Sequence, residues 1–442
     1  MSKFKISVLF VLVFSILLTG CTYSNAGIDT IMTPPKLSKE QNEIYAALSE
    51  NVGKNIKLKY PRSGEFTSAF LIANIDEEPT DEAIVFYENS NNSTATMPIR
   101  IKVLDQINGK WVSRCENGVE ASEIEKVSFV NVNNQIYIII GFTLLSKSEK
   151  TVKMFRFNEG MLKEISTDLC NNYEVIDIDG NGIDEVVIVS NKAQKDKEKN
   201  LVASVNEISL SGLTATTTVK MNSDVVEYVN INSGIIYGGK PALYLDGLLG
   251  NSKLSTEILI LKDKKLTNLI YNEFSEKKIV EKTVRPLGSY SIDIDNDGIF
   301  EIPTVKPVPG YENTPKYQTQ YFTDWSYYKD FKMEIKETSF VSYQLGYALI
   351  FSDEWRDKIT LEYNIANNEA SFYSYLPKEE KIGELLFSIK VLKKSEYDPD
   401  KKHSNYDVLK DNGQLIYMCN NNYYNDDLKI NVQDIKECFM LL

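Results

Sequence analysis

The sequence of 442 residues contains a single histidine, His403, and lacks most motifs that indicate an enzyme. Mechanisms with histidine as general base, and zinc sites with histidine ligands, would all depend on that one side chain. It lies in the charged segment 398–403, where a solvated side chain is expected. No Gly-x-Ser-x-Gly motif or Gly-rich phosphate loop is present, and the Ser-x-x-Lys match at 275–278 lacks its partner motifs. These absences favour a protein without catalytic activity.

Cysteine is also scarce. Cys21 lies near the N-terminus, and Cys115, Cys170, Cys419 and Cys438 are spread over the rest of the chain. Four cysteines allow three disulfide pairings, and an exported protein permits them. Buried free thiols explain so sparse a set equally well. The spacing indicates no zinc site.

Long apolar runs occur only at the N-terminus, where two lysines precede an apolar run from Ile6 to Leu18. The run is too short for a comfortable membrane span. The Leu-Thr-Gly-Cys ending at Cys21 resembles the signal of bacterial lipoproteins. That resemblance implies a signal peptide over 1–20, lipidation of Cys21 (palmitate among the acyl groups), and a lipid-anchored location on the extracytoplasmic side of the cell membrane. An ordinary signal peptide with a cysteine near its cleavage site is the alternative.

Basic residues are outnumbered, with 49 Lys and Arg against 62 Asp and Glu. Loss of residues 1–20 removes two lysines and no acidic residue, which changes the net charge from −13 to −15. So acidic a surface repels nucleic acid, and we expect no nucleic-acid partner. The 26 Tyr and 19 Phe favour strands over helices.

Strand-like segments fill the chain beyond a polar tether over 21–37 and a short helix with a capping box from Ser38 to Gln41. Alternating apolar, β-branched and aromatic residues predict strands at 56–60, 83–87, 99–104, 136–142 and 151–157. Acidic or Asn-rich loops, each followed by a strand-like segment, begin at residues 74, 131, 177, 230 and 293. A period of about 50 residues is typical of propeller blades, each made of a few short antiparallel strands.

Two of these loops carry the full pattern of a calcium-binding loop. Oxygen-bearing side chains occupy loop positions 1, 3, 5 and 9, glycine at position 6 permits the turn, and position 7 offers a backbone carbonyl. The predicted ligands are Asp177, Asp179, Asn181, Ile183 and Glu185 in the first loop, and Asp293, Asp295, Asp297, Ile299 and Glu301 in the second. Plain hairpin turns without metal are the alternative, and the turn is preferred at 74–82, where Pro79 replaces the glycine.

With these loops, residues 55–335 resemble the FG-GAP/VCBS-type repeat family of integrin-like β-propellers. The resemblance implies a mainly β chain, with a calcium-stabilised propeller of about five to seven blades following the helix within 38–340. An array of β-sandwiches with calcium loops is the alternative.

Residues 341–442 have a different pattern, with consecutive strands and a final helical stretch from Val432 to Leu441. This order predicts a small antiparallel α+β domain. The segment Phe351-Ser-Asp-Glu-Trp355 weakly resembles the entry of PsbP/Mog1-like domains, although Ser352 replaces their proline.

The sequence therefore predicts a non-catalytic, membrane-anchored lipoprotein of the cell envelope, whose propeller binds a protein, a peptide or a glycan. The alternative is an envelope polysaccharide hydrolase or lyase that uses Asp and Glu residues. A pocket that contains two carboxylates, neither bound to calcium, would favour the alternative.

Overall fold

The computed structural model describes residues 37–442 except 77, 90–95, 147–148, 192–199, 251, 272–276, 380, 399–404, 421–427 and 429. The predicted signal peptide, the lipidation site Cys21, nearly all of the tether, and His403 lie outside the described residues. The chain is mainly β, with 59% of residues in strands and 8% in helices. In the described part, no helix is both long enough and apolar enough to cross a membrane.

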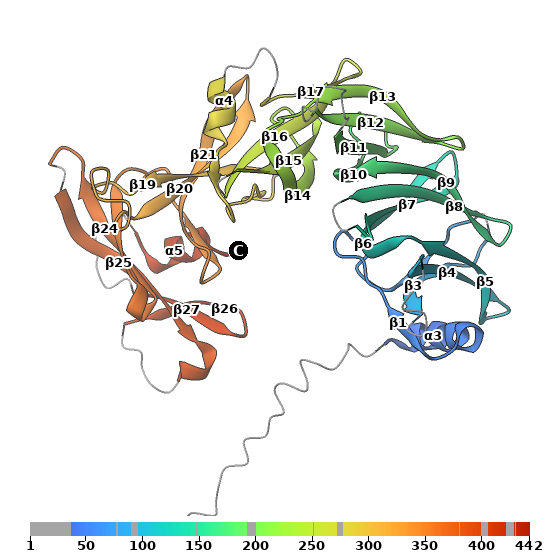
Figure 1. Cartoon of the computed structure of the whole chain (residues 1–442). Coiled ribbons are helices and arrows are strands. Elements are labelled where there is room, and N and C mark those ends of the chain that lie inside the picture. The colour runs from blue at the N-terminus through green and yellow to red at the C-terminus, as the bar shows by residue number, and fades with distance from the viewer. Residues whose placement is uncertain are drawn as a thin grey trace, which may run out of the picture.

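The strands form six antiparallel sheets, here numbered in chain order (Figure 1). Sheet 1 contains β1 (Ile56–Leu58), β2 (Phe70–Ala73), β3 (Glu82–Asn89), β4 (Ile99–Ile107) and β5 (Lys110–Val119). Sheet 2 contains β6 (Ala121–Val132), β7 (Gln135–Leu144), β8 (Lys150–Asn158) and β9 (Met161–Cys170). Sheet 3 contains β10 (Asn172–Ile176), β11 (Glu185–Asn191), β12 (Leu201–Ser209) and β13 (Gly212–Lys220).

Sheet 4 contains β14 (Val225–Ile235), β15 (Pro241–Leu249), β16 (Lys253–Lys262), β17 (Lys265–Asn268) and β18 (Arg285–Pro286). Sheet 5 contains β19 (Ile302–Pro307), β20 (Tyr321–Lys329), β21 (Lys332–Ser342), β22 (Tyr347–Ile350) and β28 (Phe439–Leu441). Sheet 6 contains β23 (Ile359–Asn364), β24 (Glu369–Leu376), β25 (Lys381–Lys393), β27 (Leu415–Asn420) and β26 (Asp407–Asp411). The helices are α3 (Lys39–Val52), α4 (Lys277–Lys282) and α5 (Val432–Cys438), with 3₁₀ turns at Ile365–Asn367 and Lys394–Glu396.

Helix α3 begins at the predicted capping box. The Ser38 hydroxyl accepts the Gln41 backbone N–H at 3.1 Å, and the Gln41 side chain accepts the Ser38 N–H at 3.0 Å. Ile44 and Leu48 lie on one face, are fully buried, and pack on sheet 1. This helix therefore covers the free side of the first sheet.

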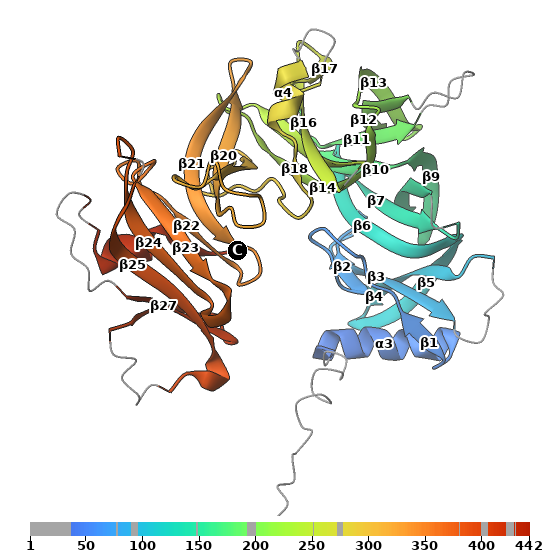
Figure 2. The same cartoon turned by 60° about the vertical axis from the view of Figure 1, so that its left-hand side comes forward.

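The sheets follow one another along an open arc, and the described residues contain no closed ring (Figures 1 and 2). In sheets 2 and 3 the spatial order of the strands is their chain order, and the first strands β6, β10 and β14 lie toward the inside of the arc. Separate apolar cores join neighbouring sheets, because each sheet has two faces to bury. The repeated antiparallel sheets agree with the predicted mainly β class.

Sheets 5 and 6 share one core, which includes Phe340, Phe372 and Phe439. The chain returns to sheet 5 at its end, where β28 pairs with β22. The helix predicted from Val432 ends at Cys438, and the remaining residues form β28 instead. The predicted domain boundary after residue 340 falls within β21, and the division into domains stays a prediction.

The four described cysteines, Cys115, Cys170, Cys419 and Cys438, are free thiols. Cys170 and Cys419 are buried, and the other two are half-buried. The structure therefore agrees with the free-thiol alternative. The apolar cores join the sheets without disulfide bonds between these cysteines.

Candidate functional site

The loop at 177–185 joins β10 to β11 and folds around the Asp177 carboxylate. Its Oδ1 accepts the backbone N–H groups of Gly180 (2.8 Å) and Asn181 (3.0 Å), and its Oδ2 accepts that of Gly182 (2.8 Å). Gly182 has φ of 88°, a conformation that side chains with a Cβ rarely adopt. The predicted glycine is thus required by the turn.

Three predicted ligands of this loop converge, since oxygens of Asp177, Asp179 and Glu185 lie within 4.8 Å of one another. Glu185 is 6% exposed, and its Oε2 accepts the Ile178 N–H at 3.2 Å. Burial and the nearby Asp179 charge raise the pKa of Glu185 to about 7. No described residue forms an ion pair with these three carboxylates. The cluster could hold a metal ion, and oxygen ligands of this kind suit a hard divalent cation.

The Asn181 amide and the Ile183 residue complete the predicted set. Asn181 Oδ1 accepts the Ile183 N–H at 2.7 Å, which orders the turn after Gly182. The Ile183 side chain is 38% exposed, as expected where only its backbone carbonyl has a role.

The loop at 293–301 repeats this geometry just before β19. Asp293 Oδ1 accepts the Asp297 N–H at 3.0 Å, and Oδ2 accepts the Gly298 N–H at 2.8 Å. Oxygens of Asp293, Asp295 and Asp297 lie within 4.8 Å of one another, so this cluster could also hold a metal ion. Glu301 is fully buried, its Oε2 accepts the Ile294 N–H at 3.1 Å, and Ile299 is nearly buried.

A lysine that the sequence analysis did not single out lies among these carboxylates. Lys336 Nζ, from β21, lies 2.7 Å from Asp295 Oδ2, 2.6 Å from Asp297 Oδ2 and 3.0 Å from Glu301 Oε1. The loop at 177–185 has no such neighbour among the described residues.

The loop at 74–82, which lacks the glycine, retains the glutamate that accepts an isoleucine N–H. The buried Glu82 accepts the Ile75 N–H at 2.9 Å through Oε2. An isoleucine N–H and a glutamate seven residues later are thus paired in all three loops, at 75 and 82, 178 and 185, and 294 and 301. The spacing of seven residues is a repeat signal that holds even where the glycine is lost.

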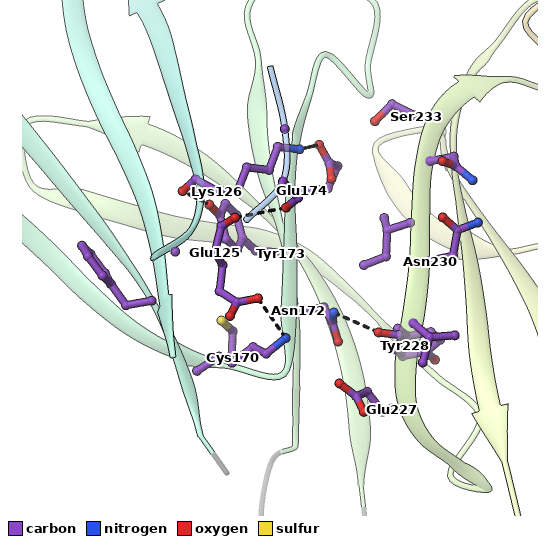
Figure 3. A pocket seen from close by; sticks show the side chains of 18 of the residues that line it. Glu125, Lys126, Cys170, Asn172, Tyr173, Glu174, Glu227, Tyr228, Asn230 and Ser233 are labelled. Atoms are coloured by element: carbon purple, nitrogen blue, oxygen red, sulfur yellow. Dashed lines mark hydrogen bonds and ion pairs between the residues drawn. The ribbon is translucent and has the colours of Figure 1, made fainter. Parts of the chain in front are cut away.

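A cavity of about 680 Å³ opens on the inside of the arc, lined mainly by the first strands of sheets 2, 3 and 4 (Figure 3). Each of these strands contributes one glutamate: Glu125 from β6, Glu174 from β10 and Glu227 from β14. Because the sheets repeat, residues about 50 apart in sequence meet at one place. We call this cavity the inner pocket.

The carboxylates of the inner pocket differ in their surroundings. Glu125 Oε2 lies 3.2 Å from Lys150 Nζ, and Oε1 lies 3.6 Å from an Arg62 nitrogen and accepts the Thr143 hydroxyl. Burial acts to raise the pKa of Glu125, but Thr143 and Lys150 outweigh it and hold the pKa below the usual value. Glu125 is therefore ionised at neutral pH.

Of the other two glutamates, Glu174 forms an ion pair within the described part of the chain and Glu227 does not. The Lys126 ammonium forms an ion pair with Glu174 (Figure 3). Glu227 is exposed to the pocket, and its carboxylate forms no hydrogen bond or ion pair with any described residue.

The floor of the pocket depends on a close approach between sheets 2 and 3. The Tyr173 hydroxyl donates to the Lys126 carbonyl at 2.9 Å, and the ring lies against Gly141. A Cβ at residue 141 would lie 2.3 Å from the ring, so only glycine fits. On the opposite wall, Asn230 and Ser233 of β14 face the pocket (Figure 3).

The sequence analysis identified none of the residues of this pocket. The available signal was weak: one glutamate near the start of each first strand, 49 and 53 residues apart, in step with the loop repeat. Many glutamates are present in the chain, and only the strand pairing selects these three.

No family model matches this chain, and no curated protein matches it. The FG-GAP/VCBS and lipoprotein resemblances thus gain no support from either comparison and stay predictions. Solved structures do match. Rhamnogalacturonan lyase YesW is 12% identical, covers 75% of this chain and 77% of its own, and has a TM-score of 0.31.

Two further matches are an exo-β-1,3-galactanase from Phanerochaete chrysosporium and the periplasmic gluconolactonase PpgL from Pseudomonas aeruginosa. The galactanase is 10% identical, covers 80% of this chain and 81% of its own, and has a TM-score of 0.29. The lactonase is 10% identical, covers 66% of this chain and 92% of its own, and has a TM-score of 0.29. Sequence identities and TM-scores this low assign neither a substrate nor site residues to this chain.

These neighbours are β-rich folds, and by name they are enzymes. They contradict the prediction of a protein without catalytic activity, which we do not retain. The physical reason is that the prediction relied on missing histidine and nucleophile motifs. Carboxylate chemistry needs neither, because two glutamates brought together by the fold leave no local motif.

Proposed function

We propose that this protein is an envelope polysaccharide hydrolase or lyase that acts through the glutamates of the inner pocket. The observation that carries the proposal is the convergence of Glu125, Glu174 and Glu227, from three successive sheets, on one cavity of about 680 Å³. A cavity of this size accommodates a few sugar units, and its Asn and Ser side chains suit hydroxyl groups.

Hydrolysis is the better supported of the two reactions. Glycoside hydrolysis needs one carboxylate as base or nucleophile and a second carboxyl group as acid. Thr143 and Lys150 keep Glu125 ionised, which suits the first role, and the Glu227 carboxyl group, exposed to the pocket without an ion pair to a described residue, would take the second. A lyase needs a free cation to neutralise a uronate carboxylate. Both pocket lysines already pair with glutamates.

The test compares the full chain with Glu125→Gln and Glu227→Gln on rhamnogalacturonan, β-1,3-galactan and envelope polysaccharide. Reducing-sugar release reports hydrolysis, and ultraviolet absorbance of an unsaturated product reports elimination. We expect either substitution to lower turnover at least 100-fold, by analogy with the loss of general acid–base groups. Glu164→Gln, an exposed glutamate of β9 outside the pocket, is the matched control. Full activity of Glu125→Gln, or no turnover of any polysaccharide, contradicts the proposal.

The location of the protein is part of the same proposal. The Leu-Thr-Gly-Cys segment supports lipidation of Cys21, which would keep the pocket at the membrane surface, near envelope polysaccharide. Cys21→Ser should then release the protein from the membrane fraction of cells. Unchanged fractionation of that variant would contradict the anchor.

Calcium enters the proposal as a structural cation. In the loop at 177–185, three converging carboxylates, the Asn181 amide and the Ile183 carbonyl would supply the oxygens that calcium prefers. Burial of Glu185 beside two aspartates supports a bound cation, because such a group is costly to leave uncompensated. The site lies outside the inner pocket, so it would fasten sheet 3 and take no part in the reaction.

A further inference from the structure

Both complete acidic loops follow the same ligand rule, but only one has a lysine inside it. Lys336 Nζ contacts Asp295, Asp297 and Glu301 at 2.6–3.0 Å. An ammonium group with three carboxylate partners has each of its three hydrogens donated, so it is fully satisfied there. A divalent cation that used the same oxygens would have to displace it.

The position of Lys336 arises from a β-bulge. In the pairing of β20 with β21, Trp325 faces Glu337 and Ser326 faces Ile335, so Lys336 is the extra residue without a partner. A bulge re-aims the side chain of its extra residue and strengthens the local twist. Here it directs the lysine to the loop that precedes β19, the other neighbour of β20.

A similar bulge occurs between the last two strands of sheets 1, 2 and 3. The extra residue is Arg114 between β4 and β5, Ile165 between β8 and β9, and Thr216 between β12 and β13. These residues occupy equivalent places in sheets 1, 2 and 3. Their side chains differ in charge: Arg114 is basic, whereas Ile165 and Thr216 are neutral.

In sheet 1 the bulge residue is also a cation that neutralises buried acid. The Arg114 guanidinium contacts Asp105 Oδ2 at 2.6 and 2.8 Å, and Asp105 is the cross-strand partner of Glu82. Sheet 2 has no acidic loop at this place and carries the apolar Ile165. The bulge residue of sheet 5 contacts the acidic loop itself, whereas that of sheet 1 pairs with Asp105 on the neighbouring strand.

Sheet 3 breaks this relation. Its loop is acidic, but Thr216 is neutral, and its hydroxyl donates to the Val205 carbonyl at 3.3 Å. Glu185 is 6% exposed, its Oε2 accepts the Ile178 N–H at 3.2 Å, and its carboxylate lies beside those of Asp177 and Asp179. Of the two loops with a full ligand set, the loop at 177–185 has no cationic side chain from the described residues.

We propose that the bulge residue of sheets 3 and 5 decides which cation closes the acidic loop of its sheet. Lys336 closes the loop at 293–301 without metal, whereas Thr216 leaves the loop at 177–185 to a divalent cation. The chain therefore binds one calcium ion through these loops. The inference deepens the calcium part of the proposed function and is independent of the reaction in the inner pocket.

The test is calcium titration of the purified full chain by calorimetry, with circular dichroism to verify folding. Wild type should bind one ion, Lys336→Met two, and Asp179→Asn none. Thr216→Lys, which gives sheet 3 a lysine at its bulge as in sheet 5, should also bind none. Lys332→Met, an exposed lysine on the same strand, is the control and should bind one.

The outcomes separate the two halves of the inference. Two ions in wild type, or an unchanged stoichiometry in folded Lys336→Met, overturns the role of Lys336. No ion in wild type overturns the metal site at 177–185, whatever the activity in the inner pocket. If Thr216→Lys still binds one ion, at an affinity within threefold of wild type, a lysine at the bulge does not replace the metal ion, and that part of the proposal is wrong.

Discussion

The loops at 177–185 and 293–301 have nearly the same sequence rule and nearly the same backbone bonds, yet their surroundings differ. One is a cluster of carboxylates without a cationic partner among the described residues, and the other encloses the Lys336 ammonium. The difference shows that a ligand pattern defines a need for positive charge, and that the neighbouring strand decides whether the chain supplies it.

The largest effect is expected at Lys336. Lys336→Ala leaves the fully buried Glu301 beside two aspartates without a counter-ion, and breaking such a pair costs about 3 kcal/mol. Thermal denaturation in chelator should show the loss, and added calcium should restore part of it. The corresponding Thr216→Ala in sheet 3 should change the melting temperature little, which makes it the matched control. Equal losses in the two variants would remove the distinction between the loops.

The second effect is the response to calcium. With a Kd of about 10⁻⁴ M, calcium at about 100 times that concentration should stabilise the protein by about 2.7 kcal/mol. Asp179→Ala should abolish the shift in melting temperature, and Asp295→Ala should preserve it. The reverse result would place calcium in the second loop and Lys336 outside it.

The third effect concerns pH and the loop at 74–82, which has neither a full ligand set nor a lysine. Burial raises the pKa of Glu82 from 4.5 to about 7, with Asp76 and Asp105 adding to the shift. A carboxyl group with a raised pKa destabilises the fold as pH rises from about 4.5 to about 7, because the folded state resists its ionisation. Above that range the loss is complete.

Glu82→Gln should therefore be more stable than wild type at pH 8, by on the order of 1–2 kcal/mol, and close to it at pH 5. Its amide oxygen can still accept the Ile75 N–H. Urea denaturation at the two pH values measures the difference. A stability difference that does not depend on pH would show that Glu82 titrates normally.

The smallest effect is expected at loop position 7. Ile183 contributes only its backbone carbonyl and is 38% exposed, so Ile183→Ala should cost less than about 0.5 kcal/mol. Ile299 is 9% exposed and bridges Ile235 of sheet 4, so Ile299→Ala should cost about 2 kcal/mol. Melting temperatures in saturating calcium compare the two. A large loss in Ile183→Ala would mean that its side chain packs in the metal-bound loop.

Local pattern was enough to predict much of the fold. The capping box at Ser38, the strands with β-branched and aromatic residues, and the acidic loops all rest on interactions within about ten residues, which a sequence displays directly. The end of the last helix was harder to place. Phe439 to Leu441 have a helical apolar period, but pairing with β22 makes them a strand.

The inner pocket and the lysine of sheet 5 depend on register, which no local pattern reveals. Lys336 follows Asp295 by 41 residues, and its direction depends on a one-residue bulge in β21. Glu125 and Glu227 line one cavity only because three sheets stack in order. The prediction that no catalysis occurs was wrong for this reason: it searched for motifs, whereas the candidate groups are assembled by pairing and stacking.

The open arc has a consequence for the stability of its sheets. In a closed ring every sheet has two neighbours, but here the first and last sheets end the array, so sheets can separate one interface at a time. A polysaccharide in the inner pocket would contact β6, β10 and β14 together. The substrate would thus hold together three consecutive sheets of the open arc, and the protein would be most rigid while the pocket is occupied.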